Sequence, residues 1–69
     1  MENNILGINI KRHRKKQGLS QERFARVADV PYTSLTKIET RVIKNPSVFL
    51  VVKIAKALNV TVEDLANNE

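Results

Sequence analysis

The 69-residue sequence contains no cysteine and no tryptophan, and it has only two glycines and two prolines. Without cysteine, the fold cannot depend on disulfides, and thiolate zinc sites are excluded. The longest apolar run, residues 48–52, has five residues, whereas a membrane-spanning helix needs about 20. The N-terminus has neither a basic start nor a long apolar stretch, which argues against a secretory signal. We therefore expect one small domain over residues 1–69 that acts in the cytoplasm, away from membranes.

The sequence also lacks the residue combinations on which catalysis and metal binding depend. Its one histidine, His13, has no cysteine or second histidine to join it in a metal site, so we expect a partly buried, hydrogen-bonded side chain. No nucleophile, base and orienting group can be assembled from the sequence, and two scattered glycines cannot form a phosphate-binding loop. The adjacent carboxylates Glu63 and Asp64 point about 100° apart on a helix. We therefore expect no enzyme, no cofactor and no metal.

The positive charge is concentrated in the middle of the chain. The formal net charge is +5, with an isoelectric point near 10. All twelve basic residues but only three acidic ones lie in residues 11–56, which gives this segment a net charge of +9. A basic centre favours a polyanionic partner such as nucleic acid. Composition alone leaves open a soluble domain that merely happens to be basic.

Apolar residues recur at helical intervals, and no segment alternates strictly enough to be a strand. Ser20 and Thr61 are suited to cap helix N-termini, and Pro31 suits the first position of a helix. Gly18 can end a helix in the left-handed conformation. The sequence therefore predicts an all-α fold whose helices cover about residues 6–17, 21–28, 31–39, 46–58 and 62–66, with a core between 6 and 66.

The helical spacing separates core residues from surface residues. The residues expected in the core are Phe24, Ala25, Ala28, Leu35, Ile38, Val48, Val51, Val52, Ala55 and Leu58. On the other side of the third predicted helix, a polar stripe has the spacing i, i+1, i+4, i+5. This stripe consists of Tyr32, Thr33, Thr36 and Lys37. By itself, it is more often an ordinary solvated helix face than a binding surface.

Residues 6–65 resemble the lambda-repressor-like (Cro/repressor-type, XRE) helix-turn-helix family. The strongest parts are residues 18–25 (GLSQERFA) and 30–39 (VPYTSLTKIE), in the family's order and spacing. The segments that fit the family's last two helices are 46–47, 54–60 and 63–65. The resemblance implies a compact five-helix DNA-binding domain in which the second and third helices form the helix-turn-helix. It further implies a sequence-specific regulator of transcription, of the repressor kind, that binds double-stranded DNA.

The resemblance also assigns roles to individual residues. In a helix-turn-helix, the second helix of the pair lies in the major groove. The implied base-reading residues are Tyr32, Thr33, Thr36 and Lys37, and the implied contacts to the DNA backbone are Gln21, Arg41, Lys44 and Asn45. Arg14 is expected to form a partly buried structural ion pair with Glu39. The other basic residues of the same run, Lys11, Arg12, Lys15 and Lys16, are expected to be solvated and to add only long-range attraction.

Two departures from the family pattern carry further expectations. Asp29 stands at the turn position where the family usually has glycine, and we expect it to adopt a positive φ with some strain. Phe49 and Leu50 fall where the family commonly has polar residues, with Lys53 on the face of Phe49. They either form an interaction patch or pack against the C-terminal helix. We expect Phe49, Leu50 and Lys53 to form a homodimer contact, and the operator to be palindromic.

A different class of function remains as an alternative. A protein-interaction module of the same fold, such as an antitoxin-like or adaptor subunit, would need no DNA. The basic centre favours DNA, whereas the apolar pair Phe49 and Leu50 suits either function. A chain of 69 residues leaves no room for an effector-sensing domain, so we expect no small-molecule effector.

Overall fold

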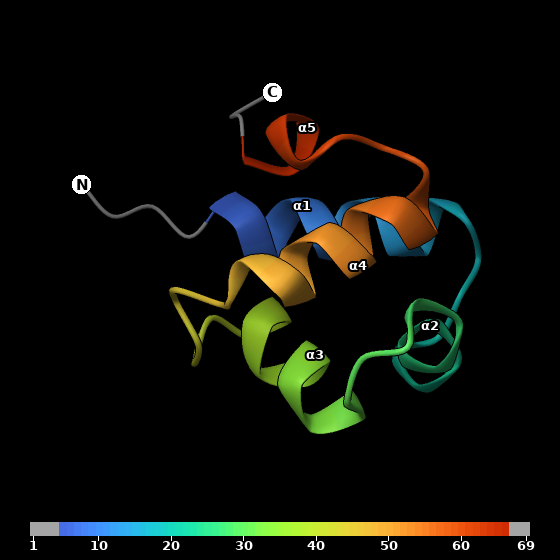
Figure 1. Cartoon of the computed structure of the whole chain (residues 1–69). Coiled ribbons are helices and arrows are strands. Elements are labelled where there is room, and N and C mark those ends of the chain that lie inside the picture. Colours follow the sequence, from blue (N-terminus) through green and yellow to red (C-terminus); the bar gives the residue numbers. More distant parts are fainter. Residues whose placement is uncertain (1–4, 67–69) are drawn as a thin grey trace.

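The computed structural model describes residues 5–66, which form helices and, within that range, no strand (Figure 1). The prediction of an all-α fold with five helices is confirmed, with boundaries that differ by no more than two residues. The helices are α1 (Ile5–Lys16), α2 (Gln21–Ala28), α3 (Tyr32–Glu39), α4 (Val48–Leu58) and α5 (Val62–Ala66).

Side-chain caps set where three of the helices begin. The Ser20 hydroxyl accepts a hydrogen bond from the Arg23 N–H at 3.1 Å, and the Ser47 hydroxyl accepts one from the Leu50 N–H at 3.2 Å. Thr61 accepts from the Asp64 N–H at 2.9 Å. The Asp64 carboxylate in turn accepts from the Thr61 N–H, which lowers the pKa of Asp64 below its ordinary value. The caps predicted at Ser20 and Thr61 are therefore confirmed.

Pro31 precedes α3, whereas the sequence predicted it as the first residue of this helix. Its ψ of 136° is extended, so it is the N-cap of α3 and not the first helical residue. Its carbonyl already accepts the first helical hydrogen bond, from the Leu35 N–H at 3.0 Å. The chain can turn into α3 only after Pro31, because this residue keeps the extended backbone of the preceding connection.

Left-handed residues end the helices and make the turns tight. Gly18 has a φ of 72°, Asp29 of 60° and Asn59 of 62°. The positive φ predicted for Asp29 is confirmed, so the turn between α2 and α3 is kept without glycine. Arg41 also adopts this conformation, with a φ of 68°, just after α3. Of these residues, glycine alone adopts it without a steric cost from a β-carbon.

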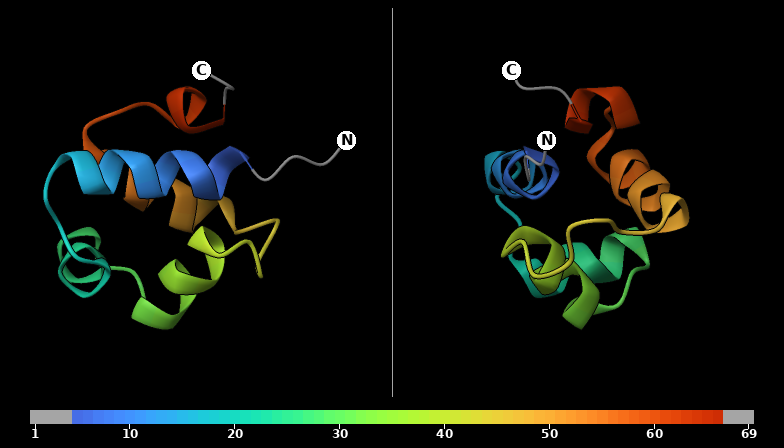
Figure 2. Two further views of the ribbon diagram at one scale, coloured as in Figure 1. Left: turned by 180° about the vertical axis from the view of Figure 1, so that it is seen from behind. Right: turned by 90° about the vertical axis from the view of Figure 1, so that its left-hand side faces the viewer.

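Helix α1 runs across the molecule between α5 on one side and α2 and α3 on the other (Figure 2). It packs against α3, α4 and α5, while α2 packs against both α3 and α4. The two helices of the predicted helix-turn-helix are therefore supported from behind by α1 and α4. This arrangement leaves one side of α3 uncovered within the described part of the chain.

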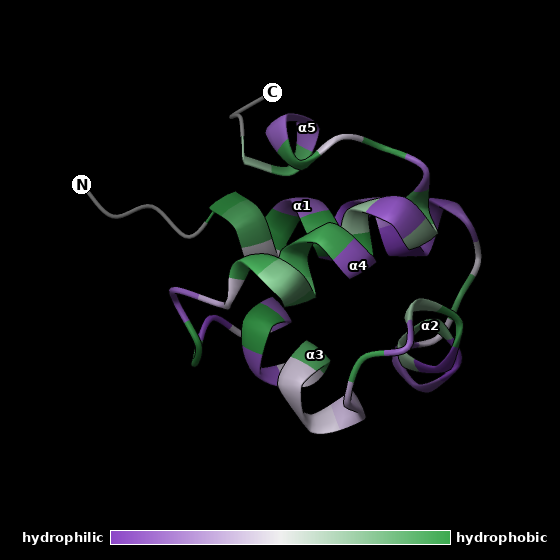
Figure 3. Ribbon diagram, in the orientation of Figure 1, coloured by the Kyte–Doolittle hydropathy of each residue, from purple (hydrophilic) through white to green (hydrophobic). Residues whose placement is uncertain are grey.

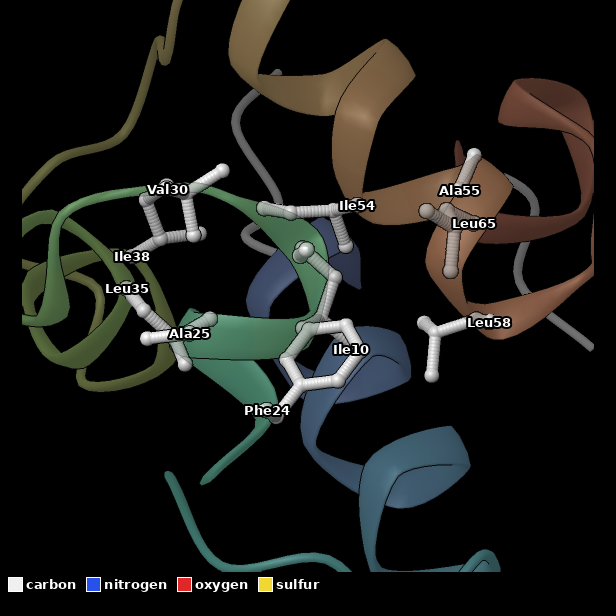
Figure 4. Close-up of a cluster of buried hydrophobic side chains, with 11 residues drawn as sticks. Ile10, Phe24, Ala25, Val30, Leu35, Ile38, Ile54, Ala55, Leu58 and Leu65 are labelled. Carbon is white, nitrogen blue, oxygen red and sulfur yellow. The ribbon is translucent and has the colours of Figure 1, made fainter. Parts of the chain in front are cut away.

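One hydrophobic core joins all five helices (Figure 4). Phe24, Leu35 and Leu65 are completely buried, although they come from three different helices. The full set of buried apolar residues in this core is Ile10, Phe24, Ala25, Ala28, Val30, Leu35, Ile38, Ile54, Ala55, Leu58 and Leu65. Most of the core expected from helical spacing is therefore confirmed.

The expectation for α4 was wrong at two positions. Val48 is 73% exposed and Val52 37% exposed, whereas Ile54 is fully buried. The buried face of α4 consists of Val51, Ile54, Ala55 and Leu58. Val52 lies beside this face. Val48 has the right spacing but belongs to the first turn, which the other helices do not cover.

Candidate nucleic-acid interface

The polar stripe of α3 lies on the surface of the molecule. The helix buries Leu35 and Ile38, so the residues on its other side face outward. Tyr32, Thr33 and Lys37 are exposed, and Thr36 is partly exposed. Figure 3 shows the N-terminal part of α3 in the pale colours of intermediate hydropathy, in contrast to the green, apolar first turns of α4. All four residues predicted to read bases therefore lie on the uncovered side of α3.

A buried network holds the C-terminal end of α3 in place. The Arg14 guanidinium donates two hydrogen bonds to the Glu39 carboxylate, from Nε at 2.8 Å and from Nη2 at 3.0 Å. Its Nη1 donates to the Leu19 carbonyl at 2.7 Å. The side chains of Arg14 and Glu39 are only 7% and 1% exposed. The ion pair implied by the resemblance is present, and it ties α1, the α1–α2 connection and α3 together.

Sequence reasoning missed a third member of this network. The Gln21 side-chain amide at the start of α2 donates to Glu39 Oε1 at 2.9 Å. An amide nitrogen carries two hydrogens, so one remains to donate to another acceptor. Gln21 is partly exposed, at the position where the resemblance implies a contact to the DNA backbone. Glu39 therefore holds in place a side chain that we expect to contact DNA.

Lys53 ties α4 to the turn of the helix-turn-helix. Its Nζ lies 3.2 Å from the carbonyl oxygen of Asp29 and 3.4 Å from the Asp29 carboxylate. Both side chains are well exposed, so the contribution of this contact to stability is small. The sequence predicts Lys53 in a dimer contact. In the single chain, its ammonium group instead contacts Asp29 of the same chain.

The loop after α3 places the cation Arg41 next to α1. Arg41, Lys44 and Asn45 are all exposed, as a contact to the DNA backbone requires. An open groove of about 480 Å³ lies on the surface between the end of α3 and α1. The residues that line it are Ile8, Lys11, Arg12, Lys15, Glu39, Thr40 and Arg41. Three of the four cations expected to spread over a solvated surface therefore share one groove, and Lys16 lies outside it.

The first half of α4 presents an apolar surface. Phe49 is 81% exposed, so it does not pack against α5, which was one of the two possibilities for this residue. Leu50 is partly buried and packs against the core. The exposed apolar surface therefore consists of Val48 and Phe49, with Val52 at its margin.

The described residues contain no sign of a metal site or a membrane segment. Within residues 5–66, no three histidine, cysteine or carboxylate side chains are grouped as metal ligands. None of the helices in that range is long and apolar enough to cross a bilayer.

A protein-family model described as helix-turn-helix matches residues 10–65. Over 65 residues, the chain is 34% identical to the HTH-type transcriptional regulator SinR of Bacillus licheniformis. The match covers 94% of this chain and 59% of that protein. The chain thus spans less than two thirds of the length of this relative.

Two solved structures have a similar fold. The N-terminal DNA binding domain of SinR from Bacillus subtilis superposes with a TM-score of 0.92 at 31% identity, covering 97% of each chain. A crystal structure of SinR, the master regulator for biofilm formation, in complex with DNA superposes with a TM-score of 0.86 at 34% identity. That match covers 90% of this chain and 98% of the other.

Proposed function

The chain belongs to the XRE-type helix-turn-helix family, and we propose that it is a transcriptional regulator that binds double-stranded DNA at specific sequences. One observation carries the proposal: α3 buries Leu35 and Ile38 against the core and leaves a polar stripe uncovered, on a helix that packs from behind against α1 and α2. A helix with one uncovered polar face is suited to enter the major groove. The solved complex of SinR with DNA supports this function for a domain of the same fold.

The residue chemistry of the stripe fits base recognition. The Lys37 ammonium group can donate to O6 or N7 of guanine, and the methyl groups of Thr33 and Thr36 can contact a thymine methyl. We assign Tyr32, which is 49% exposed, to a phosphate or to the edge of a sugar. These four residues would supply sequence preference.

A second set of residues would position the domain on the DNA backbone. Gln21 at the start of α2 has its remaining amide hydrogen available for a phosphate. Arg41, Lys44 and Asn45 are exposed in the loop that follows α3. Contacts of this kind fix register and orientation but carry no direct sequence information.

We further propose repression in the cytoplasm as the mode of action, because occupying an operator can block transcription without another activity.

We also propose that two copies bind a palindromic operator. Phe49 and Val48 form an exposed apolar surface, and burying such a surface against a second copy is favourable. Leu50 and Lys53 lie beside it on α4. In dimers of this kind, half-sites are spaced by about one helical turn, roughly 34 Å.

The same apolar surface favours a second candidate, a module that binds another protein. Titration of a labelled duplex against random competitor, at low and moderate salt, separates the two functions. A DNA-binding domain loses affinity steeply as salt rises, because counterions are released on binding. Selection from a random duplex library then tests specificity, and we expect it to enrich a palindrome. If the chain binds no duplex at low salt, the protein-interaction function is the better account.

A further inference from the structure

The groove between α1 and the end of α3 gathers positive charge from two separate parts of the chain. Residues 8, 11, 12 and 15 share one face of α1, because positions three and four apart are neighbours on a helix. Arg41 adds a cation from the opposite wall. Glu39 also lines the groove, but its carboxylate is 1% exposed and engaged by Arg14 and Gln21. The groove therefore offers an anion several cations and little competing negative charge.

Not every cation in the groove is equally available. Arg12 Nη2 donates to the Asn9 side-chain oxygen at 3.0 Å, which draws its head group along its own helix. Lys11, Lys15 and Arg41 are exposed. These three residues are the strongest candidates to contact a ligand.

The groove begins where the polar stripe of α3 ends. Thr40 lines the groove, and its hydroxyl donates to the Thr36 carbonyl, one helical turn back, at 2.8 Å. Thr36 belongs to the stripe. If α3 lies in the major groove of a duplex, a DNA strand that borders the major groove would thus lie close to Thr40 and to the cations between α1 and the end of α3.

The backbone of Arg41 supports a role for its side chain. Its φ of 68° lies in the left-handed region, where glycine is favoured and other residues are strained. The conformation closes the end of α3, since the Val42 N–H reaches the Lys37 carbonyl at 2.8 Å. An arginine here costs stability relative to glycine, and a contact made by its charged group would offset that cost.

We propose that Lys11 and Lys15 of α1, together with Arg41, form a phosphate-binding track that extends the DNA contact from α3 onto α1. The inference rests on the proposed function and deepens it, because it adds α1 to the DNA-binding surface. The partner is the phosphodiester backbone of the duplex bound by α3. The track contributes affinity without sequence preference.

The test compares two double variants that remove the same charge. Lys11→Ala/Lys15→Ala empties the track, whereas Lys16→Ala/Lys56→Ala removes two exposed lysines that do not line the groove. Each variant and the unaltered chain are titrated with a labelled mixed-sequence duplex of roughly 20 base pairs, about two helical turns, over a series of salt concentrations. All four positions are exposed, and thermal unfolding followed by circular dichroism checks that both variants fold.

We expect the track variant to bind about tenfold more weakly at low salt and to have a slope of log affinity against log salt that is shallower by about 1.8, the loss of two phosphate contacts. The control variant should change much less in both respects. If the two variants behave alike while the unaltered chain binds, the track is wrong and the proposed function stands. If the unaltered chain fails to bind duplex DNA, both are overturned.

Discussion

Gly7 of α1 lies directly against the backbone carbonyl of Ile38 in α3, so closely that a β-carbon at position 7 would overlap that oxygen. The missing side chain allows α1 to approach the last turn of α3. The same approach places Arg14 within hydrogen-bonding distance of Glu39 and brings Lys11 and Lys15 to the groove beside Arg41. One glycine thus permits both the buried ion pair and the basic groove.

We predict that Gly7→Ala destabilises the fold by about 1–3 kcal/mol, because the new methyl group forces α1 away from backbone atoms that cannot rotate aside. Urea denaturation measures the effect. Helix propensity alone predicts the opposite sign, a gain of about 1 kcal/mol for alanine over glycine inside a helix. A variant more stable than the unaltered chain would therefore show that the close approach of α1 and α3 does not matter.

Breaking the buried ion pair from one side should be costly. We predict that Arg14→Met lowers the free energy of unfolding by about 3–5 kcal/mol, because it leaves the Glu39 carboxylate buried without its cation. Glu39→Gln keeps an acceptor for Gln21 and should cost less. In a double-mutant cycle, the two changes together should cost clearly less than the sum of their separate effects. Additive effects would mean that the two residues are not coupled.

Local patterns in the sequence account for the helices, most of the core and the polar stripe. Capping residues such as Ser20 and Thr61 act within one turn of the chain, and the burial of Leu35 and Ile38 follows from helical period. This is why element boundaries and the orientation of α3 were predictable. The exposure of Val48 was not, because it depends on how far the neighbouring helices extend.

The contacts that join distant parts of the chain could not be derived from local patterns. The pairing of Arg14 with Glu39 was implied by family resemblance, and the bond from Gln21 to the same carboxylate was missed. The groove shared by Lys15 and Arg41 was also missed, because helical period places Lys15 on a face of α1 but does not reveal that this face meets the end of α3. The ion pair and the groove depend on the distance between α1 and α3, which Gly7 permits but sequence spacing does not reveal. The bond from Gln21 depends on how α2 packs against α3.

The proposed roles of Lys37 and Lys44 predict different losses of binding. Lys37→Ala should cost about 1–3 kcal/mol on a selected site and relax the preference at one base pair, since the side chain is assigned to a base edge. Lys44→Ala should weaken binding to all sequences similarly and reduce the salt slope by about one. Titrations on selected and random duplexes measure both effects. Equal losses on both duplexes for Lys37→Ala would remove Lys37 from the base-reading set.

Arg41 should show a trade-off between stability and binding. We predict that Arg41→Gly stabilises the fold by about 1 kcal/mol, because glycine adopts the left-handed conformation without strain, and that it weakens DNA binding through the lost cation. Asn59→Gly is the matched control, with the same conformation at the end of α4, distant in sequence from the DNA-contacting residues. It should leave binding unchanged and stabilise less, since asparagine tolerates this region well. Unchanged binding by Arg41→Gly would exclude the side chain from the interface.

If Phe49 forms a dimer contact, a charge at this position should lower the mass of the particle in solution without changing the fold. Phe49 is 81% exposed in the single chain, so Phe49→Glu removes no core packing and should leave thermal unfolding of the monomer nearly unaltered. In a dimer, it would bury a carboxylate at the two-fold contact, and light scattering at micromolar concentration should show a monomer. Val62→Glu places the same charge at an exposed apolar position on α5 and should not affect association. A Phe49→Glu protein no more monomeric than the unaltered chain would place the dimer contact, if any, on another surface.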